Sequence, residues 1–568
     1  MGWIKPDNVA GSAAPAIMIG LFVSFGGLLF GYDTGTISGI IAMPWWRQQF
    51  STGYINPVDQ RLGISTAQTS EIVSILSAGT FFGSLSAAPF GDRMGRRLSL
   101  MLAVGVFCFG VILQTISMKI SLFVAGRFFA GLGVGMISVL VPLYQSEMAP
   151  RWIRGTLVCA YQLAITGGLF IAAIVTYFTS EIDGPQSFRI PIALQFVWAA
   201  ILLVGLVILP ETPRYLIKRG LHGTAAASLS RIRRLDITHP ALIEELAEIE
   251  ANHAYELSLG PSTYRDVFLG SPHLGRRLLT GCGVQMLQQL SGCNYIFYFG
   301  TTFFSGRNIG SPFLFQLISD GVNTLSTLPG MVLVESWGRR RLLMVGALCM
   351  GLCQLIIASV ASSETIDTAA ANRVIVIFIC LSVFFFAASW GPVGWVITSE
   401  IYPLKVRAKS MSISTASNWL LNWALGYSTP FLTDSGSANL GPKIFFVWGV
   451  CCLVAVLFVY FMVYETARIS LEQIDELYER VDHAWNSTSF QPSWSFQDIR
   501  IEAEGVATGV SLADRDETRR RANTTTSASE GDDTISPSLN VTTSSTSNEG
   551  STSEDKIIAS LGHVNFDL

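Results

Sequence analysis

The feature of this sequence that most constrains its fold is a series of long apolar segments with almost no charge. A run of about 20 apolar residues matches a bilayer core of about 30 Å, whereas a soluble core needs no such run. Half of the 568 residues are hydrophobic and only 14% are charged, too few to cover a soluble surface of this size. The sequence therefore predicts an all-α membrane protein. Its clearest runs are Leu100–Ser117, Leu122–Leu143, Ile190–Pro210, Leu342–Val360 and Phe445–Tyr464.

Twelve such runs are expected, six on each side of a polar central stretch. The stretch contains one polar-faced helix and is too short for a globular domain. Beyond the last run, an amphipathic helix precedes a Ser/Thr-rich and acidic tail, which lacks the apolar residues needed for a core. The expected parts are an N-terminus (1–15), a six-helix lobe (16–210), a helical linker (211–277), a second six-helix lobe (278–464), a short helix (465–490) and a disordered tail (491–568).

Basic residues crowd alternate connections between the expected spans. Clusters such as Gly91–Arg97 and Glu335–Arg341 contrast with the connections between them, which carry fewer Lys and Arg. The positive-inside rule places the basic loops, the linker and both termini in the cytoplasm.

Two motifs occur once in each half of the chain. GDRMGRR follows the second span and ESWGRRR the eighth, while SEMAPRWIRG follows the fourth span and SEIYPLKVRA the tenth. Two motifs repeated in the same order indicate duplication of a six-span unit. Paired halves around a midplane site are typical of secondary transporters.

Two charged residues stand out inside the expected spans, where charge is costly and usually functional. Asp33 lies in the first span and Arg127 in the fourth, and both are flanked by glycines that let helices approach closely. Protonation of Asp33 would break an Asp–Arg pair and let the helices shift, which is a proton-coupling device in outline. A permanent structural salt bridge is an equally weighted alternative.

Uncharged amides recur in the later spans together with two tryptophans. Amides both donate and accept hydrogen bonds, which suits a ring of sugar hydroxyls, and tryptophan offers a flat face to the C–H surface of a sugar. A single membrane amide is more often a link between helices, but this many favours a polyol ligand. The candidate substrate-binding residues are Gln162, Gln288, Gln289, Asn294, Asn323, Trp395, Asn418, Trp419 and Asn422, and Gly292 is a candidate helix break among them.

Acidic and basic residues at the cytoplasmic ends of the spans form a candidate gate. Such clusters would hold the inner side closed in one state and separate in the other. Glu147 with Arg154, and Glu400 with Arg407, are each seven residues apart. The alternative is that the basic residues only orient the chain in the membrane. The acidic residues of the motifs repeat as well as the basic ones, which argues for more than orientation. The remaining gate candidates are Asp92, Arg93, Arg96, Arg97, Glu335, Arg339 and Arg340.

The sequence contains no signature of an enzyme. It has no phosphate-binding P-loop, no zinc-type His/Cys spacing and no credible Ser-His-Asp grouping, and its nine cysteines all fall within expected spans. We expect no enzymatic activity, no cofactor other than a coupling proton, no metal and no nucleic-acid partner.

The motifs taken together resemble the sugar porter family of the major facilitator superfamily. The resemblance extends from about residue 16 to about 480, and its residues are most similar to those of fungal hexose transporters. The motifs that match in order and spacing are GYDTG, GDRMGRR, PETPRY, QQLSGCNYIFY, WGRRR and GPVGW. The resemblance implies a twelve-helix, two-lobed fold, alternating access and a plasma-membrane location. It implies sugar contacts from Gln162, Gln288, Gln289, Asn294, Asn323, Trp395 and Asn422.

The same resemblance places Asp33 and Arg127 where proton symporters keep their coupling pair. Some facilitators are similar at this position, so symport and facilitated diffusion both stay open. One departure lies after the last span, where the usual Pro-Glu-Ser/Thr is replaced by Tyr464-Glu465-Thr466.

The main hypothesis is therefore transport of a hexose, glucose above all, across the bilayer. The alternatives are a porter-like glucose sensor that signals through its tail and a porter for a disaccharide or polyol. The tail has no evident repeat of a partner-binding motif, which favours transport. Its Ser/Thr runs and Lys556 suit phosphorylation and control of turnover by regulatory proteins.

Overall fold

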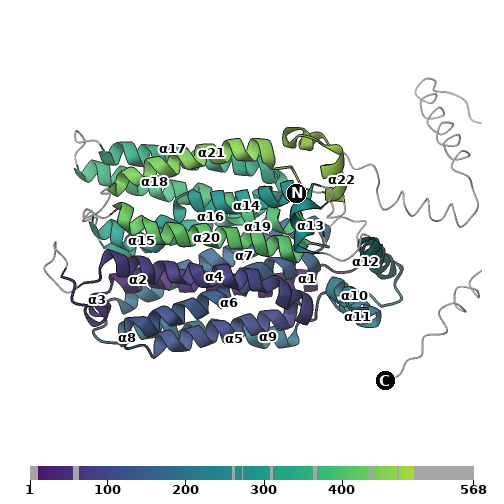
Figure 1. Ribbon diagram of the computed structural model, residues 1–568, viewed down its shortest axis with the longest axis horizontal. Coiled ribbons are helices and arrows are strands. Elements are labelled where there is room, and N and C mark those ends of the chain that lie inside the picture. The colour runs from purple at the N-terminus through teal and green to yellow at the C-terminus, as the bar shows by residue number, and fades with distance from the viewer. Residues whose placement is uncertain are drawn as a thin grey trace, which may run out of the picture. The chain divides into compact units, whose positions relative to one another are not determined.

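The computed structural model describes residues 10–55, 63–258, 263–270, 273–306, 311–362, 368–403, 405–433, 440–467, 469 and 473–490. These residues form helices that cross the molecule twelve times, in two lobes that lie side by side in Figure 1. The expected twelve-helix, two-lobed fold is confirmed. The tail at 491–568 lies outside the described residues.

The first lobe is built from six crossings, two of which are broken helices. The broken crossings join α1 to α2 at Ser24 and α8 to α9 at Leu194. The elements are α1 (Ala14–Val23), α2 (Phe25–Ala42), α4 (Thr66–Met94), α5 (Arg96–Thr115), α6 (Ile120–Met148), α7 (Arg154–Thr179), α8 (Gln186–Ala193) and α9 (Gln195–Ile208), with the short α3 (Pro44–Phe50) after α2.

The second lobe repeats this plan, again with two broken crossings. Gly292 separates α14 from α15 with a φ of 77°, a left-handed conformation that favours glycine, so the predicted break is confirmed. Ser389 separates α18 from α19. The elements are α14 (Leu274–Leu290), α15 (Cys293–Gly306), α16 (Pro312–Ser336), α17 (Arg339–Ser362), α18 (Thr368–Ala388), α19 (Trp390–Glu400), α20 (Arg407–Thr433) and α21 (Ile444–Met462).

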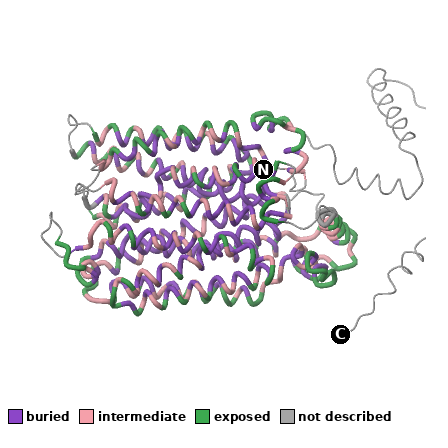
Figure 2. The backbone as a smooth tube through the Cα atoms, in the orientation of Figure 1, coloured by how far each residue is buried: buried purple, intermediate pink, exposed green. Residues whose placement is uncertain are grey.

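Ten of the twelve crossings are long and apolar enough to span a membrane by length and composition, within the part of the chain that the structure describes. The other two are the broken α14–α15 crossing and α20, which carries several Ser, Thr and Asn side chains. Large apolar side chains such as Val204 and Leu325 are more than 60% exposed. Exposed residues follow the outer helices, while the interior of the bundle is mostly buried (Figure 2). This arrangement suits a bundle surrounded by lipid.

The two lobes meet along helices from both halves of the chain. Helix α4 packs along α20, and α7 packs along α16 and α19. Near the end that carries α3, Ser38 Oγ of α2 lies 2.8 Å from Thr301 Oγ1 of α15. Because these contacts join one lobe to the other, their rearrangement is what any opening between the lobes requires.

Short helices gather at one end of the bundle, which we call the linker side, and α3 lies at the opposite end, the far side (Figure 1). The linker contributes α10 (Pro213–Lys218), α11 (His222–Arg233), α12 (Pro240–Ser258) and α13 (Tyr264–Leu269). Helix α22 (Gln473–Arg480) and the 3₁₀ turn η3 (Ala484–Ser489) follow the last crossing on the same side. The basic motifs also lie at this end.

Candidate functional site

A cavity lies where the two lobes meet. Its wall is formed by α2 and α7 of the first lobe and by α14, α15, α16, α18, α19 and α20 of the second. All nine candidate substrate-binding residues lie on this wall: Gln162, Gln288, Gln289, Asn294, Asn323, Trp395, Asn418, Trp419 and Asn422. Residues spread over more than 250 positions of sequence are thus brought to one polar and aromatic surface.

A network of amides forms the α14 and α20 side of the cavity. Gln289 donates through Nε2 to Asn418 Oδ1 at 3.0 Å, and its Oε1 accepts from Asn422 Nδ2 at 2.7 Å. Asn294, beyond the break at Gly292, also donates to Gln289 Oε1. Gln289 is therefore the centre of the network and ties both parts of the broken crossing to α20.

The amides differ in how much hydrogen-bonding capacity they keep for a ligand. Asn418 donates to Gln285 Oε1 at 2.7 Å and to Gln288 Oε1 at 3.0 Å, so it acts largely as a link between α20 and α14. Asn323 on α16 is fully buried, and neither its Oδ1 nor its Nδ2 has a hydrogen-bond partner in the structure. An unsatisfied buried amide that lines a cavity is suited to meet a polar ligand.

The two tryptophans join the lobes through their indole nitrogens. Trp395 Nε1 donates to Gln162 Oε1 at 3.1 Å, and Trp419 Nε1 donates to Ser138 Oγ at 3.2 Å. Both indoles are buried. The cavity therefore has apolar ring faces held in fixed orientation beside its amides, as a ligand with hydroxyl and C–H surfaces requires.

Sequence reasoning missed several residues of this site. Tyr298 lines the cavity and donates to Asn422 Oδ1 at 3.1 Å, and Gln285 holds Asn418 in place without lining the cavity. Gln285 lies one turn before Gln288 and Gln289, and this spacing on one helix was a usable signal. The other missed lining residues are Phe30, Thr34, Ile165, Leu169, Phe297 and Phe386.

Contacts between the lobes are present on both sides of the cavity. On the far side Ser38 meets Thr301, and on the linker side Thr156 Oγ1 of α7 lies 3.4 Å from the Met331 carbonyl of α16. A Cβ atom at Gly155 would lie 2.4 Å from Glu335 Oε1, so the first lobe touches the acidic end of α16 closely. The cavity thus lies between two sets of contacts that join the lobes.

Asp33 and Arg127 lie together inside the first lobe. Arg127 Nη1 lies 3.8 Å from Asp33 Oδ2, and both residues are only 1% exposed. Asp33 Oδ1 accepts from Gln195 Nε2 at 3.2 Å, and Arg127 Nε donates to the Ile72 carbonyl at 2.9 Å. The pair is loose, because Asp33 Oδ2 and Arg127 Nη2 have no hydrogen-bond partner in the structure.

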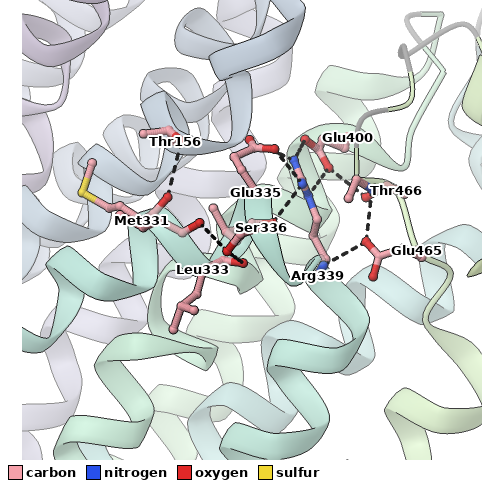
Figure 3. Close-up of polar contacts among 12 residues, drawn as sticks. Thr156, Met331, Leu333, Glu335, Ser336, Arg339, Glu400, Glu465 and Thr466 are labelled. Carbon is pink, nitrogen blue, oxygen red and sulfur yellow. Dashed lines mark hydrogen bonds and ion pairs between the residues drawn. The ribbon is translucent and has the colours of Figure 1, made fainter. Parts of the chain in front are cut away.

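Arg339 organises a buried ion cluster on the linker side of the second lobe. It lies between Glu335 and Glu400, with Nη1 at 3.0 Å from Glu335 Oε2 and Nη2 at 3.0 Å from Glu400 Oε1 (Figure 3). Two carboxylates from α16 and α19 are thereby joined to the start of α17. The arrangement fixes three helix ends relative to one another.

The first lobe contains the equivalent cluster around Arg96. Arg96 Nη2 lies 2.9 Å from Glu147 Oε1, and its Nη1 lies 3.6 Å from Asp92 Oδ1. Lys218 of α10 is 3.0 Å from the same Asp92 oxygen, so the linker also joins this cluster. Arg93 is exposed, and its carbonyl accepts from Tyr215.

The structure assigns Glu147 and Glu400 arginine partners other than those the spacing suggested. Their ion pairs are with Arg96 and Arg339, because α6 and α19 end beside the starts of α5 and α17. Arg154 and Arg407 begin the next helices, α7 and α20, where both are buried.

One carboxylate beyond the last crossing of each lobe caps the basic helix of that lobe. Glu211 accepts from the backbone amides of Arg96 and Arg97 at 3.1 and 3.0 Å. Glu465 accepts from those of Arg339 and Arg340 at 2.9 and 3.1 Å. Negative charge at a helix N-terminus is favourable, since the first amides there have no partner within the helix. The missing proline at Tyr464 leaves this contact intact.

Arg97 and Arg340 complete the repeat with a backbone contact. Arg97 Nη2 donates to the Val207 carbonyl at 3.0 Å, and Arg340 Nη2 donates to the Tyr460 carbonyl at 2.9 Å. The duplication read from the motifs therefore extends to individual hydrogen bonds. Among the described residues, no group of His, Cys, Asp and Glu side chains is placed to hold a metal.

Comparison with known proteins gives the family. The model of the family "Sugar (and other) transporter" matches residues 19–478. A probable glucose transporter of Neurospora crassa, rco-3, is 62% identical over 507 residues, covering 88% of this chain and 85% of that protein. The high glucose sensor RGT2 of Saccharomyces cerevisiae is 43% identical over 482 residues, covering 83% of this chain and 62% of the sensor.

A solved structure has the same fold. The proton:xylose symporter XylE of E. coli, bound to 6-bromo-6-deoxy-D-glucose, aligns with a TM-score of 0.71 and 26% identity. The alignment covers 82% of this chain and 100% of that one. With the family model spanning the two lobes and the linker between them, this chain belongs to the sugar transporter family of the major facilitator superfamily.

Proposed function

We propose that the protein carries a hexose, glucose above all, across the plasma membrane. The observation that carries the proposal is the cavity between the lobes, with its amide network, two tryptophans and the unsatisfied amide of Asn323. Amides satisfy hydroxyls as both donors and acceptors, and the aromatic faces cover the C–H side of the ring. The names of the Neurospora relative and of the ligand in XylE support this substrate class.

The two sets of contacts between the lobes support alternating access. The contact of Ser38 with Thr301 separates when the far side opens, and the contacts of α7 with Met331 and Glu335 separate when the linker side opens. The clusters around Arg96 and Arg339 hold helix ends together within each lobe, so each lobe moves as a unit. We assign the linker side, with both termini, to the cytoplasm on the strength of its basic motifs.

Proton coupling is the finer part of the proposal and rests on Asp33 and Arg127. Protonation of Asp33 removes the charge that balances Arg127, and two helices of the first lobe are then free to adjust. The loose 3.8 Å contact and the unpartnered atoms of both residues suit a pair that opens and closes. A permanent salt bridge would be expected to show closer, fully satisfied geometry.

Uptake of labelled glucose into proteoliposomes tests both parts of the proposal. With the purified protein and an inward proton gradient, we expect accumulation above equilibrium. Equilibration without accumulation would support transport and contradict proton coupling. Binding of glucose without entry would contradict transport and favour a sensor, for which the likeness to RGT2 is the supporting observation.

The tail at 491–568 is proposed to bind regulatory proteins that control turnover. This segment lies outside the described residues, and the proposal rests on its Ser/Thr runs and Lys556. Deleting 491–568 should lengthen the lifetime of the protein while leaving uptake per molecule unchanged. An unchanged lifetime would contradict this role.

A further inference from the structure

Helix α16 contains a buried carboxyl group that the transport mechanism above does not use. Asp320 is 1% exposed and is the ninth residue of a spanning helix, about 12 Å along its axis from the far-side end. Among the described residues, its carboxyl group has one hydrogen bond, which Gln316 Nε2 donates to Oδ2 at 3.0 Å, and Oδ1 has none. Asp320 thus contrasts with Asp33, which has an arginine beside it.

None of the ion pairs among the described residues includes Asp320. In this part of the chain, no cation therefore balances a charge on its carboxyl group. Apart from Asp320 itself, the described charged groups on α16 and its neighbours lie at the linker-side ends, except Arg373, which is exposed on α18. The titratable and charged side chains on α7, α15, α17, α18, α19 and α16 are Arg154, Cys159, Tyr161, Tyr177, Cys293, Tyr295, Tyr298, Arg339, Arg340, Arg341, Cys349, Cys353, Arg373, Cys380, Glu400 and Glu335.

An isolated carboxylate in such a place is costly, and a carboxyl group avoids the cost by holding a proton. A carboxylic acid also supplies a donor that the carboxylate lacks. Gln316 Oε1 and Asn323 Oδ1, on the same helix within one turn, are buried acceptors without a hydrogen-bond partner among the described residues. The local chemistry therefore favours the neutral acid in the conformation observed.

The environment of Asp320 also links it to the far-side contact between the lobes. A Cβ atom at Gly300 would lie 2.1 Å from Gln316 Oε1, so the partner of Asp320 is packed against α15. The next residue of α15, Thr301, makes the contact with Ser38. On the other side Thr324, one turn beyond Asp320, donates to the Thr166 carbonyl of α7 at 2.9 Å.

We propose that Asp320 is a second proton-binding site, protonated while α15 packs on α16 and the far side is closed. When α15 separates from α16, water reaches the carboxyl group and accepts its proton, leaving a solvated carboxylate. Rebinding of a proton from that water restores the neutral acid and lets α15 pack again. The role in coupling rests on the proposed transport function, whereas the protonation itself does not.

Isotope-edited infrared spectroscopy tests the protonation directly. The full-length protein is labelled with aspartate carrying ¹³C in the side-chain carboxyl and measured near neutral pH, where exposed aspartates are ionised. Asp33→Asn removes the other buried aspartate of the described spans. We expect the D33N protein to retain a carboxylic-acid carbonyl band that is absent from D33N/D320N, with the exposed Asp183→Asn as the control that changes nothing.

An Asp33→Asn spectrum with carboxylate bands alone would overturn the proposal, and so would an acid band that survives in D33N/D320N. If the double variant does not fold, the D33N spectrum still decides, because an acid band at neutral pH requires a buried aspartate. Glucose binding measured on the same samples reports the cavity separately. A sample that binds glucose but lacks the acid band would contradict the protonation of Asp320 and would leave the proposed transport function unaffected.

Discussion

Arg127 Nη1 lies 3.8 Å from Asp33 Oδ2, in a fully buried pair that lacks the close contact of a strong salt bridge. Gln195 and the Ile72 carbonyl supply the nearer hydrogen bonds of the two side chains. Each residue therefore has a polar partner besides the other. Loss of one charge does not leave the remaining group without any contact, and this makes the pair suited to repeated protonation.

Asp33→Asn should abolish accumulation of glucose against its gradient and leave exchange of labelled for unlabelled glucose largely intact. The asparagine preserves the shape and the contact with Gln195 but cannot exchange a proton. Gradient-driven uptake and exchange in proteoliposomes measure the two effects separately. Asp183→Asn, an exposed substitution of the same kind, should change neither. Undiminished accumulation by D33N would show that the pair of Asp33 and Arg127 is a structural salt bridge.

Gln289→Ala should weaken sugar affinity by about 1–2 kcal/mol, the scale of a lost polar contact, or roughly 5- to 30-fold in the half-saturation constant. The reason is that Gln289 lines the cavity and holds Asn418, Asn422 and Asn294. Concentration-dependent uptake gives the constant. The exposed Gln48→Ala is the matched control. A half-saturation constant equal to that of the native protein would remove Gln289 from the site.

Arg339→Gln should destabilise the protein by about 3–5 kcal/mol, because two buried carboxylates lose their shared cation. Arg341→Gln removes the same charge two residues away from an exposed position and should have little effect. Thermal unfolding of the two detergent-solubilised variants compares them directly. Equal unfolding midpoints for the two variants would show that the ion cluster does not stabilise the fold and that its basic residues serve only to orient the chain in the membrane.

Gly31→Ala should destabilise the packing of α2 on α7 by about 1–3 kcal/mol, the usual cost of overpacking. A Cβ atom there would lie 1.8 Å from the Ile165 carbonyl oxygen, and backbone cannot move aside as a side chain does. Gly105→Ala is the control, because nothing lies within 4 Å of its added atom and the site is exposed on α5. Similar unfolding temperatures for both variants would contradict the close approach.

Much of the fold was predictable because apolar runs and repeated motifs are local signals. The spans, the duplication and the break at Gly292 each depend on a few neighbouring residues. The partners of Glu147 and Glu400 were not predictable in this way. A spacing of seven places Arg154 near Glu147 in sequence, but the chain turns between α6 and α7, and Arg96 from a different helix occupies the position beside the carboxylate.

The cavity shows the same limit. The amides that line it were identifiable, since polar side chains stand out within apolar spans. The sequence did not predict which amides bind one another and which stay available for a ligand, because this depends on which amides lie within hydrogen-bonding distance. Asn418 is largely occupied by Gln285 and Gln288, whereas the side chain of Asn323 meets no partner among the described residues, and only the packing of α14, α16 and α20 decides this.

The polar character of α20 has a consequence for the synthesis of the protein. A segment with so many amides and hydroxyls gains little by entering lipid alone, so its insertion depends on helices already in the membrane. Its partners are α14 and, from the other lobe, α4. Replacing Asn418 and Asn422 by leucine would ease that entry and remove two amides from the cavity wall. The residues that make the cavity polar are therefore also those that make biogenesis of the last third of the chain depend on the first.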